Sequence, residues 1–215
     1  MIGIDGGRSN TRENREQRNN KGNLTYETAW REPKLFVIQV IDENGACCKK
    51  ELPLYSGRFS DEDMWKLLKE YLEALNVRGA KTVQVLADGA PWIWNKIEPL
   101  LIELGVPKEK IVLCLDYYHA SQYVHKIAEA LPESISREQR AKKLVLFKKW
   151  LWEGNCGKIV TACSRLIKHK TEDVQRWLNY LEKHENKTQY AEYERNKLKS
   201  GSGIIESGIN STLSN

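Results

Sequence analysis

Three short apolar runs in this chain each end at an aspartate. They are residues 1–4 with Asp5, residues 82–87 with Asp88, and residues 111–115 with Asp116. Helical patterns separate and follow them, at residues 60–79, 91–104 and 118–131. Strands that alternate with helices usually pair in parallel. The pattern therefore predicts an α/β fold whose parallel strands carry acidic residues at their ends.

Two more extended segments, residues 34–41 and 46–54, precede the first helix and are joined by a turn at residues 42–45. With the first strand they predict a three-strand antiparallel meander. The polar stretch at residues 8–23 has nothing apolar to bury, which indicates a mobile loop or a long hairpin arm. We expect a mixed sheet, with the meander joined to parallel strands, in the element order of a ribonuclease-H-like core.

Helical patterns dominate the chain from residue 136 onward, in segments at 136–152, 158–169 and 171–199. Glycine-punctuated sequence returns after residue 200, so we interpret the helices as an insertion rather than an independent domain. The predicted division is a catalytic core at 1–131, a helical insertion at 132–199, and the start of a helix carrying Glu206 at 200–215.

The composition excludes some classes of protein and permits others. No apolar stretch is long enough to span a membrane, and no signal-peptide pattern opens the chain. The five cysteines form no CxxC pair, which predicts reduced thiols in a cytoplasmic protein. The formal net charge of +5 permits an anionic partner.

Asp5 and Asp88 are expected to converge if their strands are neighbours, because the carboxyl ends of parallel strands form the usual ligand crevice of such sheets. Glu206 could supply a third carboxylate. Three carboxylates repel one another unless a cation neutralises them, and their hard oxygen atoms suit Mg²⁺ or Mn²⁺. Two such ions would promote in-line attack on a phosphodiester. The alternative is structural, because an aspartate before glycine is also a common turn signal.

Five stretches together point to a family. They are residues 5–8 (DGGR), 30–34 (WREPK), 87–95 (ADGAPWIWN), 115–120 (LDYYHA) and 201–207 (GSGIIES). In this order they resemble the catalytic-domain motifs of bacterial insertion-sequence DDE transposases, in the group related to Mutator-like transposases. The resemblance implies that Asp5, Asp88 and Glu206 bind the metal. It matches Asp116 and His119 to an Asp-x-x-His signature of the same site.

The resemblance also implies partners: DNA, as element ends and target, and a second copy of the chain in a homodimer. Candidate DNA contacts are Arg8 and Arg12, in the basic arm, and Trp92 and Trp94, beside the second aspartate. The alternatives are a solvated loop for the arginines and core packing for the tryptophans. His119 has the alternative of a cap or core hydrogen bond, and His125, His169 and His184 are expected to be surface or structural residues.

The leading hypothesis is metal-dependent DNA strand cleavage and strand transfer during transposition of an insertion sequence. The chain begins four residues before Asp5 and ends nine residues after Glu206, which predicts a fragment of a longer transposase. One alternative is therefore an inactive remnant that acts at most as a DNA-binding module. Another is a nuclease of the same fold, which would cleave strands without joining them.

Overall fold

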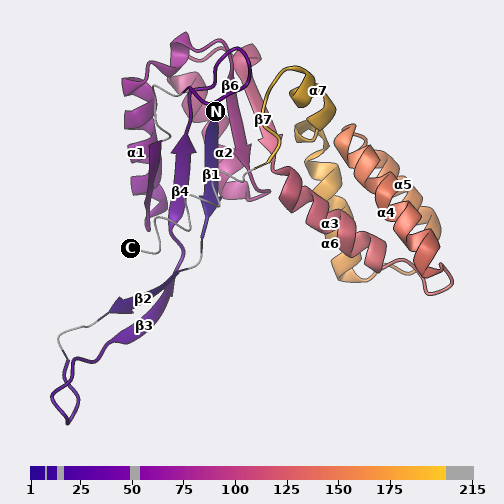
Figure 1. The fold of residues 1–215 in the computed structure, drawn as a ribbon, viewed down its shortest axis with the longest axis horizontal. Helices are drawn as coiled ribbons and strands as arrows, with labels where there is room; N and C mark the ends of the chain where they lie inside the picture. The colour runs from indigo at the N-terminus through magenta and orange to yellow at the C-terminus, as the bar shows by residue number, and fades with distance from the viewer. Residues whose placement is uncertain (8, 14–16, 49–53, 202–215) are drawn as a thin grey trace.

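A computed structural model describes residues 1–7, 9–13, 17–48 and 54–201. Its centre is a five-stranded sheet in the order β5-β4-β1-β6-β7 (Figure 1). The strands are β1 (Ile2–Gly6), β4 (Lys34–Ile38), β5 (Leu54–Arg58), β6 (Val83–Ala87) and β7 (Ile111–Leu115). β1 pairs antiparallel with β4 and parallel with β6, so the α/β class and the mixed sheet are confirmed.

The described residues contain seven α-helices. They are α1 (Asp61–Ala74), α2 (Pro91–Glu103), α3 (Tyr117–Glu129), α4 (Arg137–Trp152), α5 (Cys156–Leu166), α6 (Glu172–Lys183) and α7 (Tyr190–Arg195). Short 3-10 turns lie at Val77–Gly79, Lys108–Lys110 and Glu185–Lys187. Local sequence explains several starts: Ser60 caps α1, Pro91 opens α2, and Ser136 with Gln139 forms a capping box on α4.

Different helices pack on the two faces of the sheet, and Figure 1 shows α3 to α7 as a group beside β7. One core joins Ile4, Phe36 and Val85 to α1 and α2. The other joins Leu86 and Leu115 to α3, α4, α5, α6 and α7. Because Val85 and Leu86 are consecutive residues of one strand, they point to opposite faces and each anchors one core. The division at residue 131 stays a prediction.

A second, two-stranded sheet lies outside both cores. Its strands, β2 (Ser9–Glu13) and β3 (Glu27–Arg31), pair antiparallel and form a ribbon that extends away from the main sheet (Figure 1). Of the two forms predicted for this region, the described residues adopt the hairpin arm.

Across the described part of the chain, no helix combines the length and the apolar character that a membrane crossing requires.

One predicted element lies partly outside the described residues, and another was wrong in its extent. The third strand of the meander is Leu54–Arg58, and of the residues predicted for it, 46–54, those at 49–53 lie outside the described part of the chain. A Cβ atom on Gly57 would collide with Leu35 and the Lys34 carbonyl, so β5 and β4 pack closely at a glycine. Among the described residues before 49, Ile41 forms an isolated bridge to Cys47.

The predicted helix at 171–199 is interrupted near His184 and becomes α6, a 3-10 turn and α7. The interruption is held by long-range hydrogen bonding, because the Glu185 carboxylate accepts a hydrogen bond from the Gly157 amide at 2.8 Å. The Thr188 hydroxyl donates to the Glu185 carbonyl at 2.8 Å. Tertiary contacts therefore override a continuous helical pattern.

Candidate active site

Three aspartates lie in one row at the carboxyl ends of three neighbouring parallel strands. The register pairs Ile4 with Ala87 and Ala87 with Leu115, so the residues that follow each of these form the next row: Asp5, Asp88 and Asp116. The Asp116 amide donates to the Ala87 carbonyl at 2.8 Å, which extends the ladder to this point. Neighbouring strands lie about 4.8 Å apart, so the backbone brings the three residues together.

The pKa of Asp5 records this convergence. Burial, and then the negative charge of Asp88, raise it from 3.8 to about 6. The charge of His119 and a hydrogen bond from the Gly6 amide act against them, and the charge of Asp116 raises the value slightly more. Burial, together with the charges of Asp88 and Asp116, thus favours the protonated form of Asp5 more than water would.

Asp88 and Asp116 also organise the backbone at the edge of the sheet. Asp88 Oδ1 accepts a hydrogen bond from the Ala90 amide at 2.9 Å, which holds the turn into α2. Asp116 is fully buried, and its Oδ1 accepts from the His119 amide at 2.9 Å as the N-cap of α3. Asp88 therefore has the turn role that the alternative predicted for an aspartate before glycine, and Asp116 caps a helix, which that alternative did not cover. Both carboxyl groups nevertheless belong to the same row at the edge of the sheet.

Lys34 is a cation of this edge that sequence reasoning missed. As the first residue of β4 it pairs with Gly6, and its Nζ lies near the position that a Gly6 Cβ would take. The same Nζ lies 4.6 Å from the ring centre of Trp92. Because consecutive residues of a strand point to opposite faces, Lys34 lies on the face of Gly6 and Trp92, beside the row of aspartates, and its Nζ is 3.9 Å from the Glu32 carboxylate. The sequence feature that could have indicated this position is the antiparallel pairing predicted for the first two apolar runs, which places Lys34 opposite Gly6.

Tyr180 and His184 of α6 reach the turn that follows Asp88. A Cβ atom on Gly89 would collide with the Tyr180 ring, and both side chains hydrogen-bond to the Gly89 backbone. Tyr123 of α3 stacks on Tyr180 with ring centres 4.0 Å apart. The helices thus support the candidate site, and no motif or spacing in the sequence indicated this.

The two candidate tryptophans pack beside the site. Trp92 makes an edge-on contact with Trp65 at 6.0 Å, and Trp94 lies 6.4 Å from the His184 ring. Trp94 Nε1 and His184 Nδ1 are buried without a hydrogen-bond partner among the described residues. His184 is 3% exposed and its pKa falls to about 4, chiefly through burial and then through the charges of Lys187 and Lys183.

The chain returns to the candidate site shortly before Glu206. The Gln84 side chain donates to the Lys199 carbonyl and accepts from the Lys199 amide, so β6 binds this segment at two points. The Tyr117 amide, one residue after Asp116, donates to the Ser200 carbonyl at 2.9 Å. Glu206 itself lies outside the described residues.

The other predicted site residues are divided between the site and the arm. His119 is in the first turn of α3, close enough for its charge to lower the pKa of Asp5. Arg12 is on the ribbon, with its guanidinium 4.3 Å from the ring centre of Tyr26. Arg8 lies outside the described residues. Within the described part of the chain, no three acidic, histidine or cysteine side chains form a group that could hold a metal ion.

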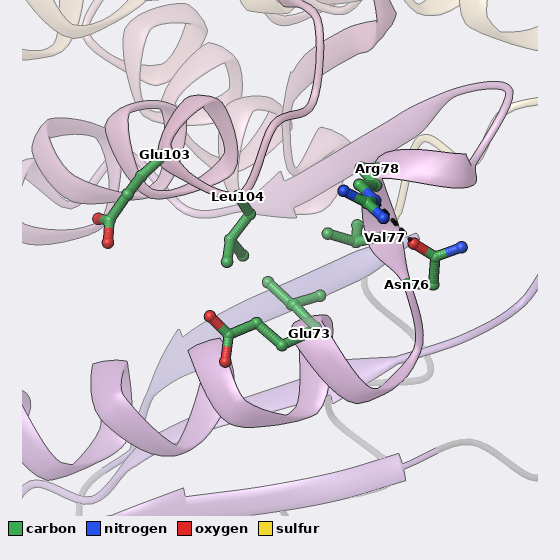
Figure 2. Close-up of a pocket in the computed structure, with 7 residues that line it drawn as sticks. Glu73, Asn76, Val77, Arg78, Glu103 and Leu104 are labelled. Carbon is green, nitrogen blue, oxygen red and sulfur yellow. Dashed lines mark hydrogen bonds between the residues drawn. The ribbon is translucent and has the colours of Figure 1, made fainter.

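A cavity of about 310 Å³ lies elsewhere, between the carboxyl-terminal ends of α1 and α2 (Figure 2). Glu73, Asn76, Arg78 and Glu103 line it. Both helices end at the edge of the sheet where the parallel strands begin, so this cavity is separate from the row of aspartates.

The chain matches no protein-family model, no curated protein and no solved structure.

Proposed function

We propose that this chain is the catalytic domain of a DDE transposase that cuts and joins DNA strands in a metal-dependent reaction. The observation that carries the proposal is the row of Asp5, Asp88 and Asp116, in which burial and the charge of Asp88 raise the pKa of Asp5 to about 6. An aspartate that only stabilises a turn has no need to lie close to a second carboxylate in a partly buried position. A cluster of this kind is more typical of a functional site.

The strand order supports a ribonuclease-H-like core. β1, β4 and β5 form an antiparallel meander, while β6 and β7 extend the other side of β1 in parallel. Helices follow the last three of these strands, as expected from the sequence order. In this arrangement the carboxyl ends of β1 and β6 are the place for a two-metal site.

Glu206 is our candidate for the third ligand. Ser200 is hydrogen-bonded beside Asp116, and Glu206 follows it by six residues, a reach of at most about 20 Å. The hydrogen bonds between Gln84 and Lys199 fix where this reach begins. The glycines at 201 and 203 permit close approach of the backbone.

The donor set fits Mg²⁺ or Mn²⁺. Asp5, Asp88 and Glu206 would supply hard carboxylate oxygens, and a divalent cation would offset the burial and the Asp88 charge that raise the pKa of Asp5. Two bound ions would supply Lewis acidity to the attacking oxygen and to the departing oxygen.

The remaining side chains would position DNA. His119, whose charge acts on Asp5, would contact the scissile phosphate, and Lys34, which pairs with Gly6, would contact the DNA backbone beside it. Trp92 and Trp94 lie in the first turn of α2 and Arg12 on the ribbon, and all three would contact DNA, as would Arg8, which lies outside the described residues. We propose a homodimer, in which two copies would act on the two ends of one element.

The proposed reaction has two steps, cleavage and joining. In cleavage, a water oxygen bonds to phosphorus as the bond to the 3′ oxygen breaks, which leaves a 3′-hydroxyl and a 5′-phosphate. In joining, that 3′-hydroxyl attacks a phosphodiester of target DNA. A new phosphorus–oxygen bond forms, and a target 3′ oxygen leaves and takes up a proton.

The test is cleavage of supercoiled plasmid DNA in Mg²⁺ or Mn²⁺, compared with the Asp88→Asn variant. Asn keeps an oxygen that can accept from the Ala90 amide, so the fold should survive while a metal ligand loses its charge. We expect nicking that requires the cation and disappears in the variant. DNA binding without nicking would overturn catalysis and leave the DNA-binding module, and nicking without joining would indicate a nuclease.

A further inference from the structure

The ribbon of β2 and β3 is rooted at the candidate active site. β2 begins four residues after Asp5, and the Gly7 amide donates to the Pro33 carbonyl at 2.9 Å to close its base. Farther along the chain, an isolated antiparallel bridge joins Arg18 to Leu24. Figure 1 shows the ribbon extending outward from the main sheet. Whatever polymer lies across the row of aspartates can therefore continue along the ribbon.

The two faces of the ribbon differ in chemistry. Residues opposite each other in a ladder share a face, and the register pairs Asn10 with Trp30 and Arg12 with Thr28. The contact of Arg12 with the Tyr26 ring adds Tyr26 to this face. We call these residues the aromatic face: Asn10, Arg12, Tyr26, Thr28 and Trp30. Glu27 belongs to the other face, with Thr11, Ala29 and Arg31.

The aromatic face is open to solvent and contains no carboxylate. Trp30 is 65% exposed and Tyr26 is 46% exposed, whereas Thr11 and Ala29 on the other face are half-buried. Large exposed aromatic side chains on a projecting arm usually mark an interaction surface. The stacked Arg12 guanidinium is held in one orientation, so it loses less freedom when it binds.

The partner that fits this face best is duplex DNA. The major groove of B-DNA is about 12 Å wide and admits a two-stranded β-ribbon. Arginine and asparagine are the side chains that hydrogen-bond to guanine and adenine edges there, and apolar groups contact the thymine methyl. At the tip, Arg18 and Lys21 are exposed and could contact phosphates.

We infer that the aromatic face of the ribbon enters the major groove of DNA that is bound at the row of aspartates. Arg12 and Trp30 contact base edges there. This inference rests on the proposed function for the identity of the polymer. It adds a sequence-reading element to the site, built from Asn10, Tyr26, Thr28 and Trp30 as well as the arginine.

The experiment measures binding of the full chain to labelled duplexes of mixed sequence, by fluorescence anisotropy in EDTA, where no cleavage occurs. The variants are Arg12→Ala and Trp30→Ala, with Arg31→Ala as the matched control from the opposite face. We expect the first two to weaken binding about 10-fold, the scale of one base contact, and the control to change it less than about threefold. Methylation of guanine N7, which blocks the major groove, should weaken wild-type binding.

Unchanged binding in Arg12→Ala and Trp30→Ala would overturn the inference. A Trp30→Ala effect on sedimentation alone would also overturn it, and would assign the face to contacts between copies. Neither result touches the metal chemistry, which the plasmid assay measures separately. Conversely, a chain that binds DNA through the ribbon but never nicks it would overturn only the catalytic proposal. Neither variant should alter thermal unfolding, because these residues belong to neither core.

Discussion

The ring of Tyr180, in α6, lies directly against Gly89, the residue that follows Asp88 in the candidate active site. The contact joins two segments that are remote in sequence. Because the Gly89 backbone also hydrogen-bonds to Tyr180 and His184, the position of Asp88 depends on helices that pack on the other side of β6 and β7 from α1 and α2.

Gly89→Ala should therefore damage both stability and cleavage. The new methyl group would overlap the Tyr180 ring, and we expect a loss of about 1–3 kcal/mol in the free energy of unfolding. Urea denaturation and plasmid nicking would measure the two effects. Gly157→Ala is the control, since its Cβ would meet Glu185 at 3.5 Å, an ordinary contact. Equal behaviour of the two variants would contradict the close packing at Gly89.

Asp5→Asn should make the metal-free protein more stable at pH 7 while it abolishes cleavage. The pKa of Asp5 rises to about 6 on folding, so its ionisation costs stability as the pH rises from about 4 through 6. Removing the charge should recover roughly 1–3 kcal/mol at pH 7 and little at pH 4. Thermal unfolding in EDTA at both pH values measures this. A variant that is less stable at pH 7 would show that the carboxylates do not repel each other.

His184 should destabilise the protein in acid. Its pKa falls from 6.5 to about 4 on folding, so the unfolded chain takes up a proton first. Stability from this group is present above pH 6.5 and is lost as the pH falls toward 4, by roughly 3 kcal/mol at most. His184→Phe keeps an aromatic ring and should flatten this part of the pH dependence. Urea unfolding between pH 7 and 4 tests it, and an unchanged slope would contradict the prediction.

Gln84→Leu should strongly reduce plasmid nicking, with a smaller effect on the free energy of unfolding. The variant leaves the Lys199 amide and carbonyl without their side-chain partner and releases the segment that leads to Glu206. Loss of such a supporting group typically costs about 10–100-fold in activity. Gln39→Leu is the control, because Gln39 is also buried and its Oε1 lacks a partner among the described residues. Equal cleavage by both variants would separate Glu206 from the site.

The parallel half of the fold could be predicted because its signals are local. Each apolar run has the length of a strand and ends at an aspartate, and β7 has the predicted bounds. The strand Leu54–Arg58 packs closely against Leu35 at Gly57, a contact that β propensity does not indicate. The gathering of Asp5 and Asp88 followed from strand adjacency, which the order of elements indicated.

Contacts between remote segments could not be predicted. Lys34 reaches the site only through its pairing with Gly6, and Tyr180 only through the packing of α6. Lys34 lies within the motif at residues 30–34, but that motif gave it no role, and nothing in the residues around Tyr180 distinguishes it from an ordinary core side chain. His184 matched its structural interpretation, since it is buried against Trp94 and Tyr180.

The hydrogen bonds between Gln84 and Lys199 join residues 115 positions apart, so they form late during protein synthesis. β1, β6 and β7 can pair on the ribosome before residue 199 emerges from the exit tunnel. Until it does, the nascent polypeptide has two or three acidic side chains in place and lacks the anchor for Glu206. In the order of translation, this contact can therefore form only after all five strands of the main sheet have been synthesised, so assembly of the proposed site waits for a segment that emerges long after its aspartates.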